Sequence, residues 1–211
     1  MILTINGLIA GYNNNKILEA PSIKIPEGTI TLIKGLNGSG KSTLLRTINL
    51  LIPPIKGEIL FRDKFNDKNL LRKNTIMLGQ HPYIFRDTVY NNLVFGLKSD
   101  RIDKSIIKSK ANMWLEKMGL TELIKKNAYQ LSGGELQRLS LARTFIVDRS
   151  VYILDEPDSM LDVNYIAILN EIILDIKSAG YSVLLTTHKQ DFMEKEADLL
   201  IKIENGLVQI L

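Results

Sequence analysis

The residues best suited to chemistry lie in a glycine-rich segment that directly follows a short apolar run at 30–34. The segment comprises Gly35, Asn37, Gly38, Ser39, Gly40, Lys41, Ser42 and Thr43. Glycines let successive backbone N–H groups turn around phosphate oxygens, and the helix expected next adds the positive end of its dipole. Lys41 would then contact the phosphates and Ser42 would offer its hydroxyl to Mg²⁺. A tight glycine turn without a ligand is the alternative, but it leaves the lysine and hydroxyls unexplained.

Two adjacent carboxylates follow a second apolar run, 151–154. A strand over that run places Asp155 at the carboxyl edge of a sheet, where open α/β sheets bind their ligands. We expect Asp155 to hold Mg²⁺ and Glu156 to point toward the reacting phosphate and orient water. The alternative is that both residues only cap the turn before Pro157.

A second candidate anion site begins at Ser132. Serine is a common N-cap residue, and Gly133 and Gly134 leave backbone N–H groups bare at the start of a helix that continues to Ile146. An ordinary capped helix without a ligand is the alternative reading of this segment.

Short β-rich runs fill residues 1–80, and runs with helical spacing fill 89–146 with a stop at Gly119. Strand-like and helical runs then alternate at 151–154, 165–176 and 183–186, which predicts βαβ units and a parallel sheet. The dipeptide Asn205-Gly206 between two apolar runs predicts a hairpin near the end.

Composition excludes several classes of protein. The 211 residues carry a formal charge of +4 and no cysteine, so disulfide scaffolds, thiolate metal sites and cysteine nucleophiles are absent. No apolar run approaches a membrane span, and the first residues lack a signal-peptide pattern, so an intracellular location is expected. The segment 98–126 holds eight Lys and Arg against four Asp and Glu. A solvated helix face explains this excess; proximity to an anionic membrane or to nucleic acid is the alternative, and without interleaved aromatic residues nucleic acid is not expected.

The segment 131–135, Leu-Ser-Gly-Gly-Glu, resembles the signature sequence of ATP-binding-cassette (ABC) ATPases. The resemblance covers essentially the whole chain, with the motifs in the order of the family. It implies one α/β domain with a RecA-like P-loop NTPase core over 1–85 and 147–211. The core would have a mostly parallel sheet and an antiparallel β part near the N-terminus. An inserted helical subdomain would occupy 86–146.

The resemblance also assigns roles to single residues. Tyr12 corresponds to the aromatic residue that stacks on adenine, Gln80 to the glutamine that reaches Mg²⁺, and His188 to the histidine at the γ-phosphate. Ser132, Gly133, Gly134 and Glu135 would bind the nucleotide of a partner copy, and the loop that ends at Asp162 would communicate across the dimer. The family commonly has Thr or Ser at the position of Asp158 and Ala at that of Met160. The chain therefore departs from the family pattern in the loop that would communicate across the dimer.

A function follows from the resemblance as an expectation. ATP and Mg²⁺ would be sandwiched in a head-to-tail homodimer that drives transmembrane permease subunits from the inner face of the membrane. The segment 80–93 looks more like importers, including those for oxyanions such as tungstate or phosphate, and a solute-binding protein would take part indirectly. A soluble ABC ATPase that acts on DNA or the ribosome, and a P-loop small-molecule kinase, remain the alternatives.

Overall fold

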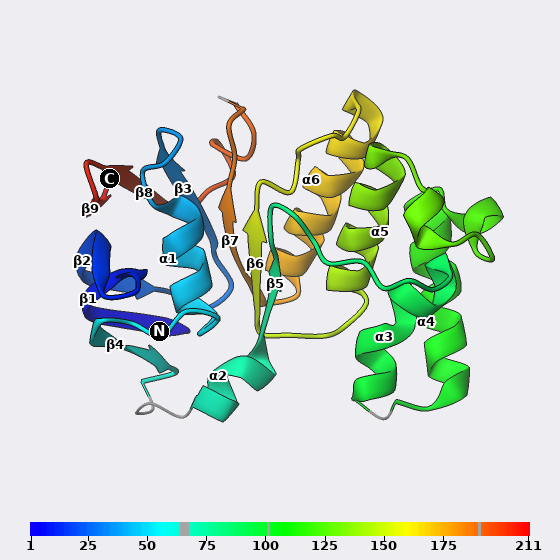
Figure 1. The fold of residues 1–211 in the computed structure, drawn as a ribbon, viewed down its shortest axis with the longest axis horizontal. Coiled ribbons are helices and arrows are strands. Elements are labelled where there is room, and N and C mark those ends of the chain that lie inside the picture. Colours follow the sequence, from blue (N-terminus) through cyan, green and yellow to red (C-terminus); the bar gives the residue numbers. More distant parts are fainter. Residues whose placement is uncertain (64–67, 101, 190) are drawn as a thin grey trace. The chain divides into compact units, whose positions relative to one another are not determined.

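The computed structural model describes residues 1–63, 68–100, 102–189 and 191–211, and Figure 1 shows its helices and strands. The chain divides into two compact units. The first unit consists of Met1–Gln80, Arg149–Glu156 and Ile172–Leu211, and the second consists of His81–Asp148 and Pro157–Glu171. The chain therefore passes from the first unit to the second between Glu156 and Pro157.

The first unit is built on a sheet in the strand order β4-β1-β2-β9-β8-β3-β7-β6-β5. The strands are β1 (Leu3–Tyr12), β2 (Asn15–Ile25), β3 (Ile30–Gly35), β4 (Lys56–Phe61), β5 (Thr75–Leu78), β6 (Val151–Asp155), β7 (Ser182–Thr186), β8 (Leu199–Glu204) and β9 (Leu207–Ile210).

The half of this sheet from β8 to β5 is parallel, as predicted. All five residues of β6 and all five of β7 are buried. Continuous apolar strands of this kind are typical of parallel sheets that are covered on both faces. The carboxyl ends of β3, β6 and β7 meet at one edge, which brings the glycine-rich loop beside Asp155.

The other half of the sheet contains the antiparallel pairs β1 with β2 and β1 with β4. The predicted hairpin is confirmed, since β8 and β9 pair antiparallel around Asn205 and Gly206. Both turn residues have positive φ, 49° and 75°, the backbone that a two-residue type I′ turn requires.

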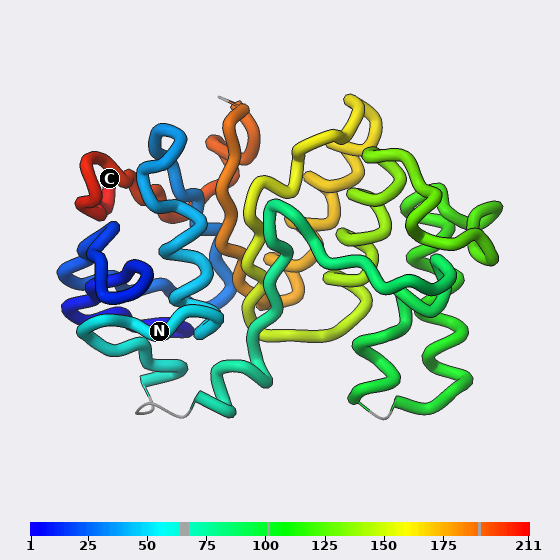
Figure 2. The backbone as a smooth tube through the Cα atoms, in the orientation of Figure 1, coloured from blue at the N-terminus to red at the C-terminus, as the bar shows by residue number. Residues whose placement is uncertain are grey.

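Helix α1 (Lys41–Ile48) begins where the glycine-rich loop ends, and Figure 2 follows the backbone from β3 through this loop into the helix. The helix contacts β1, β2, β3 and β6, and Leu44, Leu45 and Ile48 join the core of the first unit. Its N-cap residue Gly40 has φ 108° and provides no side-chain cap, so the first N–H groups of α1 remain available to a ligand. A short helix, α2 (Lys68–Asn74), precedes β5.

The second unit contains helices α3 (Val89–Ser99), α4 (Lys104–Lys117) and α5 (Gly133–Phe145) and two short 3₁₀ helices, η1 (Thr121–Leu123) and η2 (Ala128–Gln130). Helix α3 packs against both α4 and α5. The ring of Trp114 on α4 stacks on that of Phe145 on α5 with centroids 5.7 Å apart. The predicted stop at Gly119 is also confirmed, because the residue has φ 60° just beyond the end of α4.

Helix α6 (Val163–Ser178) begins in the second unit and ends in the first. Across the described ranges, no helix combines the length and the apolar character that a bilayer crossing requires.

Candidate functional site

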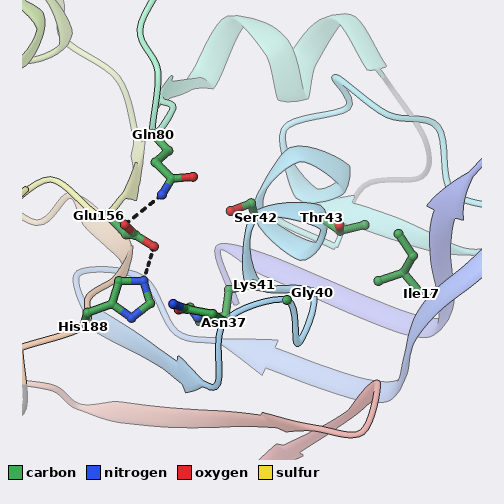
Figure 3. Close-up of a pocket in the computed structure, with 10 residues that line it drawn as sticks. Ile17, Asn37, Gly40, Lys41, Ser42, Thr43, Gln80, Glu156 and His188 are labelled. Carbon is green, nitrogen blue, oxygen red and sulfur yellow. Dashed lines mark hydrogen bonds and ion pairs between the residues drawn. The ribbon is translucent and has the colours of Figure 1, made fainter.

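A cavity of about 370 Å³ in the first unit brings half of the predicted site residues together (Figure 3). Its lining joins the loop after β3 and the start of α1 to side chains at the ends of β5, β6 and β7. The lining residues are Ile17, Asn37, Gly38, Gly40, Lys41, Ser42, Thr43, Gln80, Glu156 and His188. Every one of these except Ile17 was a candidate from the sequence.

Glycine is required in the loop for two different reasons. A Cβ atom on Gly35 would lie 2.6 Å from the carbonyl oxygen of Ile203 and 2.6 Å from Ser39 Oγ, so no larger residue fits beside β8. Gly38 and Gly40 have φ of 77° and 108°, where side chains are disfavoured. These φ values let the backbone curl tightly between β3 and α1, as it does in phosphate-binding loops.

The ammonium group of Lys41 is held inside this loop. Lys41 Nζ donates to the carbonyl oxygens of Gly35 at 2.9 Å and Leu36 at 3.1 Å, and the residue is only 6% exposed. Burial lowers the pKa of Lys41 below its ordinary value of 10.5, while the nearby carboxylates of Glu156 and Asp155 act in the opposite direction. A buried cation with carbonyl partners alone is well placed to take an anion from the cavity.

Asp155 ends β6 and is 1% exposed. Its Oδ1 accepts a hydrogen bond of 2.9 Å from the hydroxyl of Thr186 on the neighbouring strand β7. Its Oδ2 is buried and has no hydrogen-bond partner. Because buried polar atoms are nearly always paired, this free oxygen indicates a ligand that the carboxylate would contact, and a divalent cation fits.

The carboxylate of Glu156 lies between Gln80 and His188 (Figure 3). Gln80 Nε2 donates to Oε2 at 3.0 Å, and His188 Nε2 contacts Oε1. The backbone N–H of Glu156 donates to Thr186 Oγ1 at 2.9 Å. Glu156 has φ 54°, a left-handed conformation that non-glycine residues rarely adopt and that is frequent at functional sites.

Protein side chains alone do not form a metal cage in the described part of the chain, since no group of three His, Cys, Asp or Glu could hold an ion. Mg²⁺ is commonly bound by one or two protein groups together with substrate phosphates and water. Ser42 and Gln80 line the same cavity, and the unpaired Oδ2 belongs to the adjacent Asp155. The donor set therefore fits Mg²⁺ in the presence of a phosphate ligand.

Tyr12 lies at the end of β1 with 40% of its surface exposed. Its hydroxyl accepts a hydrogen bond of 3.1 Å from Arg46 Nη1 on α1. The residue is absent from the lining of the cavity, so its stacking on adenine stays a prediction.

The remaining predicted residues lie in the second unit. Ser132 is the N-cap of α5, as the sequence indicates, and forms a capping box with Glu135. The carboxylate of Glu135 accepts the backbone N–H of Ser132 at 2.7 Å, and this bond is the main reason that the pKa of Glu135 falls below its ordinary value. Asp162 Oδ1 accepts the N–H groups of Asn164 and Tyr165 at the start of α6.

Thr186 is the functional residue that the sequence analysis missed. It pairs with Asp155 across β6 and β7, and its hydroxyl links Asp155 to the backbone of Glu156. The available signal was a threonine at the end of the run 183–186, whose other three residues are apolar. Ile17 was missed as well, because a partly buried isoleucine in a strand carries no chemical signature.

Comparison with known proteins agrees with this geometry. The sequence profile of the family described as "ABC transporter" matches residues 18–159. The L-cystine import ATP-binding protein of Bacillus subtilis is 32% identical over 98% of this chain and 88% of its own length. The tungstate uptake system ATP-binding protein of Peptoclostridium acidaminophilum is 29% identical over 99% of this chain and 97% of its own. A solved ATP-binding subunit of an ABC transporter has the same fold, with a TM-score of 0.90 at 24% identity over 100% of this chain and 90% of that one.

Proposed function

The chain belongs to the ABC transporter family of ATP-hydrolysing domains, and on that basis we propose that it powers the import of a solute through separate transmembrane permease subunits. The observation that carries the proposal is the Glu156 carboxylate, held by Gln80 and His188 in the same cavity as the phosphate-binding loop. This arrangement suits attack of water on a terminal phosphate.

In this proposal the loop and α1 bind the phosphates of ATP. Backbone N–H groups of the loop and of the first turn of α1 contact phosphate oxygens, except that of Ser39, which donates to the carbonyl oxygen of Leu36. The ammonium group of Lys41 exchanges its carbonyl partners for phosphate oxygens. Ser42, Gln80 and Asp155 would hold Mg²⁺, which neutralises phosphate charge when it is bound. Tyr12 would stack on the adenine ring, for which its exposed face is available.

Glu156 then acts on the attacking water. Its carboxylate would accept a hydrogen bond from the water that attacks the γ-phosphate and would then take the proton of that water. Gln80 and His188 hold the two carboxylate oxygens in position. His188 is 45% exposed, so it can also turn toward the γ-phosphate as that group moves into the cavity. The catalysis is one of positioning and charge stabilisation.

The proposal includes a head-to-tail homodimer. Ser132 and Gly133 at the start of helix α5 are exposed and Gly134 is partly exposed, and the capping box between Ser132 and Glu135 fixes the geometry of this helix start. We propose that this helix start binds the γ-phosphate of an ATP whose other phosphates rest in the loop of a second copy. Asp162, at the end of the neighbouring loop, would contact the second copy.

Import is favoured over export by relatives named for uptake of cystine and of tungstate. Their substrates differ, so the solute is set by the membrane partner, with an oxyanion such as tungstate or phosphate as our first candidate. A solute-binding protein would deliver it outside the membrane, and this chain would work on the cytoplasmic face.

Copurification tests the transport part of the proposal. The tagged chain, extracted from the membranes of its own host in detergent, should bring with it an integral membrane protein that stimulates its ATP hydrolysis. Exclusive recovery from the soluble fraction with nucleic acid or ribosomes would contradict it.

A further inference from the structure

Arg138, on helix α5, joins three segments of the second unit. Its Nη1 donates to the carbonyl oxygen of Met118 at 2.7 Å and to the hydroxyl of Tyr165 at 2.6 Å. Its guanidinium carbon also lies 4.2 Å from the centre of the Tyr165 ring. One side chain thus ties the end of α4 and the first turn of α6 to α5, through both a charge-assisted hydrogen bond and a cation–π contact.

Gly119 makes room for this contact. A Cβ atom there would lie 2.1 Å from Tyr165 Oη and 2.9 Å from Arg138 Nη1, and the residue has φ 60°. The glycine that ends α4 is therefore also the residue that allows Tyr165 to reach Arg138.

Helix α5 holds the loop 157–162 at two further points. Gln137 Nε2 donates to the carbonyl oxygen of Pro157 at 3.0 Å, and this bond is buried. Cβ atoms built on Gly133 and Gly134 would lie 3.2 Å from Met160 Sδ and 3.3 Å from the Met160 carbonyl oxygen. The loop is thus contacted by α5 at its beginning and middle, while Tyr165 fixes the helix that follows it.

The loop starts one peptide bond after Glu156. The backbone of Glu156 is itself constrained, by the bond of its N–H to Thr186 and by the proline that follows it, which restricts the torsions of the preceding residue. Pro157 is bonded directly to Glu156, so a displacement of Pro157 acts on the backbone that carries the Glu156 carboxylate.

We propose that Gln137, Arg138 and Tyr165 are positioning residues that make the loop 157–162 move as one body with α5. A change at the N-terminus of α5 then reaches Glu156 through Pro157 within the same copy of the chain. The inference rests on the proposed role of Glu156 in hydrolysis, and it is local to each copy, unlike the contact of Asp162 with a second copy.

Tyr165→Leu, which removes both the hydroxyl and the ring, is the main test. We expect kcat for ATP hydrolysis to fall about tenfold to a hundredfold, since small displacements of a catalytic group have effects of that size. The KM for ATP should stay within about twofold, because the phosphate-binding loop belongs to the other unit. Tyr165→Phe keeps the ring over Arg138 and should lose less activity.

Tyr129→Leu is the matched control. Tyr129 lies in the same unit, with its ring 5.8 Å from the guanidinium carbon of Arg86 and its hydroxyl on the carbonyl oxygen of Ile84. It makes the same kinds of contact as Tyr165, away from the loop 157–162, so kcat should be unchanged.

Amide hydrogen exchange tests whether these contacts hold the loop 157–162 in place, independently of ATP hydrolysis. Exchange at residues 158–161 should accelerate at least about fivefold in Tyr165→Leu and stay unchanged in Tyr129→Leu, with the rest of the chain protected as before. Gly119→Ala should reproduce the effect by displacing Tyr165.

Three results would overturn the inference: unchanged exchange at 158–161, unchanged kcat, or a loss of kcat matched by an equal rise of KM. If exchange accelerates as expected but Glu156→Gln hydrolyses ATP at the normal rate, the proposed role of Glu156 fails and the loop contacts stand.

Discussion

Asp155 and Thr186 end two neighbouring parallel strands, and the Thr186 hydroxyl donates to Asp155 Oδ1 at 2.9 Å. The same hydroxyl accepts the backbone N–H of Glu156. One buried threonine thus orients the candidate metal ligand and anchors the residue that we propose to act on water.

Thr186→Val tests this relationship because it keeps the shape of the side chain and removes its hydroxyl. The Glu156 N–H and one Asp155 oxygen would lose their partner, so we expect a loss of about 1–3 kcal/mol in the free energy of unfolding. Turnover should fall more than ATP affinity does. Denaturant unfolding and steady-state kinetics measure both, and full activity in the variant would show that Thr186 does not position the site.

Lys41→Ala tests the phosphate-binding loop. A hydrogen bond to a charged group contributes about 1.5–3 kcal/mol, and about 1.4 kcal/mol corresponds to a tenfold change in affinity. We therefore expect the Kd for ATP to rise roughly tenfold to a hundredfold. Calorimetric titration measures the change, and wild-type affinity in the variant would rule out phosphate binding by Lys41.

Removal of Mg²⁺ tests the metal ligands. Excess EDTA should abolish ATP hydrolysis, and restoring Mg²⁺ should recover it. Asp155→Asn retains the shape of the side chain but loses its charge, so the Mg²⁺ concentration for half-maximal activity should rise by about tenfold or more. Thr186 Oγ1 can still donate to the amide oxygen, which keeps the side chain in place. An unchanged Mg²⁺ requirement would remove Asp155 from the metal site.

The capping box at the start of α5 predicts a pH dependence. The pKa of Glu135 is lowered from 4.5, mainly because its carboxylate accepts the Ser132 N–H. A carboxylate with a lowered pKa in the folded state stabilises the protein above its unfolded-state value, and the effect disappears as the pH falls through the folded-state value. Wild type should therefore have a higher Tm than Glu135→Gln at pH 7, with a difference that shrinks below about pH 4.5. A difference that is constant over this range would contradict the assignment.

Local patterns were sufficient for much of the fold. Apolar runs predicted the buried strands, Asn205-Gly206 predicted the last hairpin, and Ser132 predicted the start of α5, because each of these signals lies within a few residues. The first two strands, Leu3–Tyr12 and Asn15–Ile25, are much longer than the apolar runs within them. Polar residues, glycines and Pro21 interrupt the apolar pattern of these two strands, so the pattern alone does not show that pairing extends each strand over its full length.

Local sequence patterns could not predict contacts between residues that are far apart in the sequence. The convergence of Gln80, Glu156 and His188 was expected only from the family resemblance, since nothing in their spacing requires it. The contact of Arg138 with Tyr165 joins helices that are distant in sequence. Pro157–Glu171 belongs to the helical unit, whereas the sequence predicted that this segment belongs to the nucleotide-binding core. The contact of Arg138 with Tyr165 is one of the contacts that join the segment to the helical unit.

If two copies of the chain bind ATP together, the Glu156→Gln variant should be a dimer in solution when ATP is bound. This variant should retain ATP while turnover becomes at least about a hundredfold slower, since it loses the proposed base. Light scattering with saturating Mg²⁺ and ATP should give twice the mass of one chain, and removal of nucleotide should return it to one. The mass of one chain with ATP bound would show that the nucleotide is not shared between two copies.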